Sequence, residues 1–218
     1  MRREAAFLAM TIGEYFRNRG DHVLCLMDSL TRVAAAQREI GLAAGEPPTA
    51  KGYTPSVFSL LPKLLERAGA GTAGAGAVTG VFTVLVEGDD HDEPIADAAR
   101  AILDGHVVLD RRIAERGRFP AIDILRSVSR TAGLGEGAGL HETARRARAL
   151  ASVYEDMREM IRIGAYKPGA NDEVDRAIDF HAQLENFLTQ GRGEAFGSAA
   201  AEAGLIDMLT NIQRTCAR

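Results

Sequence analysis

Apolar positions along the chain first follow helical spacing and then form a continuous run that stops at an acidic residue. Within residues 3–19 they recur every few positions, at Ala6, Phe7, Met10, Ile12 and Phe16. This spacing predicts an amphipathic helix that Gly20 ends. The next stretch, residues 22–27, is almost wholly apolar and is typical of a buried strand. The strand is expected to stop at Asp28, directly before a second helical pattern.

Helices and strands are expected to alternate further along the chain. Helical patterns cover residues 30–45 and 56–69, and the glycine-rich residues 69–77 predict a hairpin-like surface loop. Strands are expected at 78–86 and 107–109, with a helix at 95–103 between them, and a loop at 127–130. This alternation predicts an α/β fold, in which helices flank a partial parallel sheet.

The pattern changes from residue 133 onward. A glycine-rich joint at 133–139 gives way to helical sequence that is rich in alanine, arginine and leucine, with a turn at 164–171. We expect a small all-α domain here. The predicted domains are therefore residues 1–137 and 138–218.

Composition narrows the class of protein. Of the 218 residues 46% are hydrophobic, which suits a globular core, and the formal net charge is -4. An acidic chain argues against a main role in nucleic-acid binding. Cys25 and Cys216 form no disulfide framework or metal-binding spacing, so a reducing cytoplasm fits. No segment approaches the roughly 18 consecutive apolar residues of a membrane helix.

The residue chemistry points to a nucleotide site that is only partly present. A carboxylate at the end of a buried strand, such as Asp28, can hold a magnesium-bound water in the ligand crevice. A solvated carboxylate is the simpler alternative. The sequence contains no G-x-x-x-x-G-K-[ST] phosphate loop. Residues 69–77 do not replace it, because neither Lys-Ser nor Lys-Thr follows them and the next element is a strand.

Several motifs together resemble one family. They include Met27-Asp28-Ser29-Leu30-Thr31-Arg32, Gly45-Glu46-Pro47-Pro48, Glu87-Gly88-Asp89-Asp90, Ile102-Leu103-Asp104-Gly105-His106 and Phe119-Pro120-Ala121-Ile122-Asp123. In these the chain closely resembles the flagellar type III protein export ATPases, which are relatives of the rotary ATP synthase catalytic subunits. The resemblance is dense over residues 3–131 and looser beyond. It implies a RecA-like fold and covers the C-terminal half of such a protein, as in a fragment, a split-gene product or a truncated chain.

The resemblance also implies roles for single residues. Asp28 matches the acidic residue that holds water on Mg²⁺, and Arg32 matches a position near the γ-phosphate, where a structural salt bridge is the alternative. Arg130 matches the arginine finger that enters a neighbouring subunit's site, with a plain surface arginine as the alternative. Phe119 matches the aromatic residue that stacks on adenine, although an apolar core position is also open.

An acidic loop matches the pore-facing loop that meets the central stalk in the rotary family. Its residues are Asp89, Asp90, Asp92 and Glu93. Acidic loops are more often simply exposed to solvent, so both interpretations stay open.

The implied function is part of an ATPase subunit that couples ATP hydrolysis to export of flagellar proteins, with ATP and Mg²⁺ as cofactors. The implied partners are a homo-oligomeric ring, with a hexamer expected, a central stalk protein, the export gate, and export substrates with their chaperones. The expected location is cytoplasmic, peripheral to the membrane at the base of the export apparatus, without nucleic acid. Because it lacks a phosphate loop, the 218-residue chain alone is expected to be inactive. The alternative is a non-hydrolytic interaction module that supplies an arginine finger and a stalk-facing loop to a ring.

Overall fold

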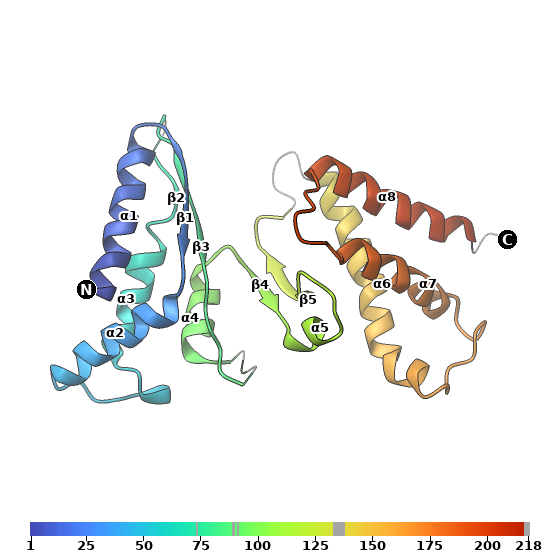
Figure 1. The fold of residues 1–218 in the computed structure, drawn as a ribbon, viewed down its shortest axis with the longest axis horizontal. Coiled ribbons are helices and arrows are strands. Elements are labelled where there is room, and N and C mark those ends of the chain that lie inside the picture. Colours follow the sequence, from blue (N-terminus) through green and yellow to red (C-terminus); the bar gives the residue numbers. More distant parts are fainter. Residues whose placement is uncertain (73, 89, 91, 133–137, 216–218) are drawn as a thin grey trace. The chain divides into compact units, whose positions relative to one another are not determined.

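The computed structural model describes residues 1–72, 74–88, 90, 92–132 and 138–215 (Figure 1). The chain forms two compact units, Met1–Asp104 and Gly105–Arg218. The predicted boundary at 137/138 falls inside the second unit, beside residues outside the described ranges. It stays a prediction.

The first unit contains a small sheet and its flanking helices. Its elements are α1 (Arg2–Asn18), β1 (His22–Met27), α2 (Leu30–Ala43), the 3₁₀ turn η1 (Ala50–Gly52), α3 (Pro55–Leu65), β2 (Gly69–Ala70), β3 (Ala77–Phe82) and α4 (Pro94–Ile102). β1 and β3 pair in parallel, from His22 with Ala77 to Met27 with Phe82. β2 pairs antiparallel with the start of β3. The expected parallel pair and the hairpin-like glycine-rich segment are both confirmed.

β3 ends earlier than the expected strand at 78–86. β1 stops at Met27, so the chain beyond Phe82 soon has no strand partner on that side. Instead it follows the start of α2, where Leu30 N donates to Thr83 O at 2.9 Å and Leu85 N donates to Thr31 Oγ1 at 2.9 Å. The segment after β3 is therefore fixed by α2 rather than by a ladder.

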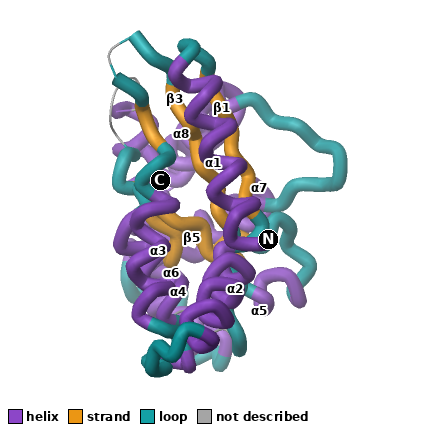
Figure 2. The backbone as a smooth tube through the Cα atoms, turned by 90° about the vertical axis from the view of Figure 1, so that its left-hand side faces the viewer, coloured by secondary structure: helices purple, strands orange, loops and turns teal. Residues whose placement is uncertain are grey.

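The core of the first unit lies on one face of the sheet, where α1 packs beside β1 and β3 (Figure 2). Its fully buried members include Met10, Leu30 and Leu64. Gly41 allows α2 and α3 to approach, because a Cβ at this position would lie 2.4 Å from Thr54 Oγ1. A larger residue at 41 would force the two helices apart.

Alternate residues of β1 face opposite sides of the sheet, as the pleat requires. Val23, Cys25 and Met27 pack against the core, whereas Leu24 and Leu26 are 63% and 70% exposed. Within the first unit this sheet face is uncovered, and the outer edge of β1 has no strand partner among the described residues, which favours association between chains.

We therefore expect the 218-residue chain to self-associate, and Leu24→Lys with Leu26→Lys to weaken this association. Burying a leucine side chain contributes about 1.5–3 kcal/mol, so the double change should raise the dissociation constant by more than about tenfold. Sedimentation equilibrium measures it. Ile163→Lys is the control, since Ile163 is equally exposed but lies just beyond a helix end. A parent chain that stays monomeric at high concentration would contradict the expectation.

The second unit joins a two-stranded sheet to three long helices. Its elements are β4 (Gly105–Leu109), α5 (Arg111–Glu115), β5 (Ile122–Ser129), α6 (Ala138–Arg162), α7 (Asp172–Leu188) and α8 (Ser198–Thr215). Phe180 and Leu184 of α7 are buried with Leu209 and Ile212 of α8 and two alanines of α6. The predicted all-α region is confirmed.

Two local expectations are corrected in this unit. The strand at 107–109 does not extend a parallel sheet, because β4 pairs antiparallel with β5. Between them lie only the five-residue α5 and a turn, which Asp110 N closes by donating to Ala121 O at 2.9 Å, so β5 runs back beside β4. Residues 127–129 were expected in a loop, yet they end β5, where Ser129 pairs with Gly105.

None of the helices in the described ranges has the length and apolar character needed to span a bilayer.

Candidate functional site

The carboxyl ends of β1 and β3 bring two polar side chains together. Asp28 follows the last residue of β1, and Thr83 follows the last residue of β3. Because the strands are parallel and in register, these residues lie side by side, and Thr83 Oγ1 donates to Asp28 Oδ1 at 2.7 Å. Both are exposed. The carboxylate is therefore held in place from one side, while its other oxygen has no hydrogen-bond partner in the part of the chain that the structure describes.

Sequence reasoning found Asp28 but missed Thr83. The available signal was that Thr83 is a hydroxyl residue inside an apolar run. It directly follows β3, just as Asp28 directly follows β1. Using that signal requires the strand register, which the sequence pattern does not supply.

The site suits a magnesium ion that is held through water. Mg²⁺ keeps several waters and needs only one or two carboxylates when phosphates complete its coordination. Within the described ranges no group of three or more acidic, histidine or cysteine side chains could hold a metal. A single oriented carboxylate such as Asp28 is chemically compatible with a water-mediated contact to Mg²⁺, and this role of Asp28 stays a prediction.

Arg32 lies on α2, one turn beyond Asp28. Its side chain is exposed and makes no hydrogen bond or ion pair with the residues that the structure describes. The structure thus provides no salt bridge that would explain this arginine. Its place near a γ-phosphate stays a prediction.

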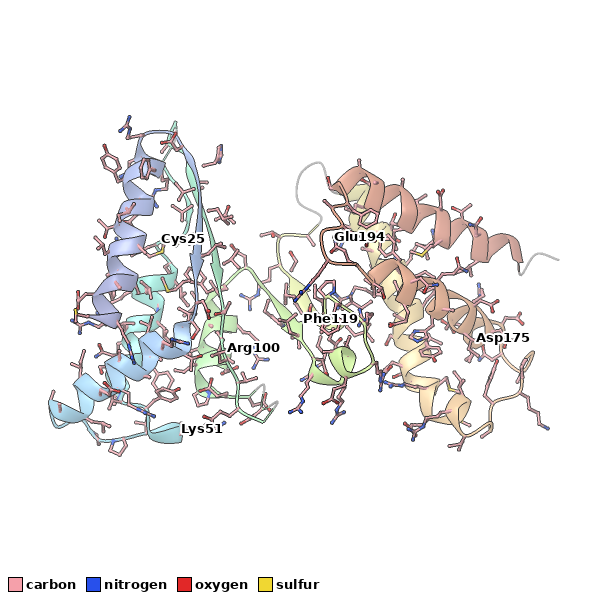
Figure 3. All side chains as sticks on the ribbon, in the orientation of Figure 1. Cys25, Lys51, Arg100, Phe119, Asp175 and Glu194 are labelled. Atoms are coloured by element: carbon pink, nitrogen blue, oxygen red, sulfur yellow. The ribbon has the colours of Figure 1, made fainter. Side chains whose placement is uncertain are left out.

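Phe119 and Arg130 belong to the second unit. Phe119, labelled in Figure 3, lies between α5 and β5, and its side chain is 55% exposed, which argues against the core alternative. Arg130 directly follows β5 and is also exposed. Next to it, Ser129 Oγ accepts a hydrogen bond from Ala132 N at 3.1 Å, which shapes the chain around the arginine.

The acidic loop is tied to the first unit through Asp90, Asp92 and Glu93. Asp89 lies outside the described residues. Asp90 forms an ion pair with Lys51, and this hydrogen-bonded carboxylate raises the pKa of the lysine. Glu93 is buried and caps α4, where its Oε2 accepts from Ile95 N at 3.2 Å and Ala96 N at 3.1 Å. The Asp92 side chain is fully exposed, and its Oδ1 lies 3.9 Å from Arg100 Nη2 on α4.

Glu93 therefore has a structural role that sequence reasoning missed. The signal was an acidic residue directly before Pro94, since proline favours the first turn of a helix and a carboxylate satisfies its free amides. A stalk-contact role for Asp90, Asp92 and Glu93 stays a prediction.

Comparison with known proteins places these features in a family. Residues 1–129 match the model of the ATP synthase alpha/beta family, nucleotide-binding domain, and residues 140–207 match the T3SS EscN ATPase C-terminal domain. The flagellum-specific ATP synthase of Caulobacter vibrioides is 57% identical over 199 residues, which cover 89% of this chain and 45% of that protein.

Solved structures agree. The assembled ATPase EscN from the enteropathogenic E. coli type III secretion system has a TM-score of 0.87 at 44% identity and covers 94% of this chain. EscN in complex with its central stalk EscO has a TM-score of 0.84 at 42% identity, over 95% of this chain. Each match spans 49% of the EscN chain, so this chain spans about half the length of its relatives. The chain belongs to the ATP synthase alpha/beta family, as its resemblance to flagellar type III export ATPases predicted.

Proposed function

We propose that this chain forms part of an ATPase subunit that couples ATP hydrolysis to type III export of flagellar proteins. The observation that carries the proposal is the Asp28 carboxylate, held by Thr83 at the carboxyl ends of two parallel strands. Ligands of α/β sheets bind at this end of the strands. The similarity to flagellum-specific ATP synthases supports the choice of substrate and pathway.

In this proposal Asp28 accepts a hydrogen bond from water on Mg²⁺, and Thr83 keeps the carboxylate turned toward the site. Mg²⁺, when bound, neutralises charge on the terminal phosphates. Arg32, one turn along α2, adds a positive charge beside the γ-phosphate. Its exposed guanidinium, without a partner among the described residues, is available for this contact.

Phe119 and Arg130 serve the nucleotide from the second unit. The exposed Phe119 ring stacks on adenine, because an aromatic face can bind a base through π contact. Arg130 acts in a neighbouring subunit's site, where a guanidinium stabilises charge on the transferring phosphoryl group. Activity then depends on a ring of subunits, and the assembled form in which the relative EscN was solved supports a role for assembly.

The further partners are a central stalk, the export gate, and export substrates with their chaperones. The EscN complex with its stalk EscO supports a stalk-facing surface in this family. We assign it to the acidic loop, where Asp92 is fully exposed and Asp90 remains partly accessible. The assembly is proposed to lie at the base of the flagellar export apparatus, peripheral to the membrane.

ATP turnover of two proteins tests the proposed function. One is the 218-residue chain, and the other is a chimera that adds the part of the Caulobacter relative that this chain does not match. We expect no turnover from the chain, because it contains no G-x-x-x-x-G-K-[ST] segment to grip the phosphates. The chimera should hydrolyse ATP with Mg²⁺.

Two outcomes would contradict the proposal. Turnover by the chain alone that disappears with Asp28→Asn would show that the phosphate grip lies elsewhere. A folded, ring-forming chimera without turnover would instead favour the non-hydrolytic interaction module.

A further inference from the structure

The exposed ring of Phe119 sits on a backbone that is held from a distant part of the chain. Phe119 O accepts a hydrogen bond from Gln190 N at 2.7 Å, and Gln190 lies in the connection after α7. The backbone of Gln190 is itself part of an ordered turn, since its side chain donates from Nε2 to Glu194 O at 2.7 Å. An exposed aromatic side chain thus projects from a fixed point.

The residue before Phe119 makes a second link, to α7 itself. Arg118 is only 9% exposed, and its Nε lies 3.2 Å from Glu185 Oε2 on α7. Its Nη2 donates to Ile122 O, the first residue of β5, at 3.0 Å. The guanidinium therefore ties α7 to both ends of the short segment that carries Phe119. Such a half-buried pair is costly to break, because removal of one partner leaves the other charge without compensation.

The Nη1 atom of Arg118 is buried and has no hydrogen-bond partner among the described residues. The described residues therefore satisfy only some of the donors of this guanidinium. Its two satisfied donors, Nε and Nη2, reach Glu185 on α7 and the carbonyl of Ile122, which follows Phe119 in the chain. Their joint effect is to fix the backbone from which the ring projects.

We propose that Arg118 is a positioning residue for Phe119, acting with Glu185 and with the bond between Phe119 and Gln190. Together these contacts make α7 and the connection after it determine where the ring lies. A rigid ring binds a flat ligand at less entropic cost than a mobile one. The link to nucleotide affinity rests on the proposed function, whereas the positioning itself does not.

The sequence contains no tryptophan, so Phe119→Trp introduces a single fluorophore at the position in question. Fluorescence anisotropy decay of the 218-residue chain then measures ring motion. In this background, Arg118→Met keeps an apolar stem but removes both contacts, Arg118→Lys keeps the charge, and Glu185→Ala removes the partner. Arg111→Met is the matched control, because Arg111 is an exposed arginine on nearby α5 that pairs with Glu115.

We expect Arg118→Met to lower the residual anisotropy by about half, as a fixed side chain gains nanosecond loop motion. Glu185→Ala should have a smaller effect in the same direction, Arg118→Lys should restore part of the loss, and Arg111→Met should have none. Thermal unfolding followed by circular dichroism identifies any variant that is globally unfolded. If Arg118→Met is unfolded, the anisotropy of Glu185→Ala tests whether the ion pair restricts the ring. Unchanged anisotropy in folded Arg118→Met or in Glu185→Ala would overturn the proposal.

A second measurement separates positioning from nucleotide binding. In the chimera, Arg118→Met should raise the KM for ATP with little change in kcat, because the adenine contact is remote from phosphoryl transfer. Increased ring motion without any effect on KM would leave Arg118 as a positioning residue and contradict adenine stacking by Phe119. A fall in kcat alone would contradict the assigned route of action.

Discussion

Replacing Arg130 with alanine is expected to lower ATP turnover of the ring-forming chimera by about 10³ to 10⁵, the range that arginine fingers contribute to phosphoryl transfer. The physical reason is the loss of a planar charge that stabilises the transition state. Nucleotide affinity should change little, because the finger acts mainly on the developing charge. Steady-state kinetics should therefore show the loss in kcat rather than in KM. Arg126→Ala is the control, as it removes a partly exposed arginine of β5, the strand that Arg130 follows.

Mixing of subunits tests whether Arg130 acts across an interface. A ring assembled from Arg130→Ala and Asp28→Asn subunits contains some sites with an intact Asp28 and an intact finger from the neighbour. Such mixed rings should regain part of the turnover that each variant lacks alone. If mixing restores nothing although rings form, Arg130 acts within its own subunit and the proposed arrangement is wrong.

Replacing Asp28 with asparagine should reduce turnover of the chimera by about 10³-fold, since the contribution of a metal site is several kcal/mol and about 1.4 kcal/mol corresponds to a factor of ten. Asparagine keeps an oxygen that can accept the Thr83 hydrogen bond, so the fold should persist. Thr83→Val should have a smaller effect, because it releases the carboxylate without removing it. Turnover at several Mg²⁺ concentrations measures both.

Asp21→Asn is the matched control for Asp28→Asn. Asp21 is also exposed, but it precedes the amino end of β1, at the opposite edge of the sheet. A general effect of lost negative charge would appear in both variants. A similar loss of turnover from both, or normal turnover after Asp28→Asn, would contradict the assigned site.

The sequence pattern was sufficient to predict the elements around Asp28. Helical spacing predicted the first helix to within about two residues, and the apolar run predicted where β1 ends. Periodicity indicates which residues of one helix or strand can be buried on the same face, and this is a local property of the chain. It does not report strand direction, so the antiparallel pairing of β4 with β5 could not be predicted from it.

The partners of the candidate site residues could not be predicted from the sequence, for a related reason. Thr83 meets Asp28 only because β1 and β3 are in a particular register, which depends on packing far from either residue. The sequence left Phe119 open as a core residue or as a ligand contact. Its exposure argues against the core position, and the ligand contact stays a prediction. Glu93 differs from these residues, because its role could have been predicted locally. An acidic residue directly before Pro94 indicates a helix cap, but Glu93 was interpreted only as part of the stalk-contact loop.

The central claim is that the carboxyl end of β1 forms the Mg²⁺-facing side of the nucleotide site. A structure of the chimeric ring with Mg²⁺ and a non-hydrolysable ATP analogue tests it most directly. The account predicts a magnesium-bound water about 2.7 Å from an Asp28 carboxylate oxygen, as expected for a charge-assisted O–H···O⁻ bond. A nucleotide bound with its magnesium and waters away from Asp28 would contradict the account.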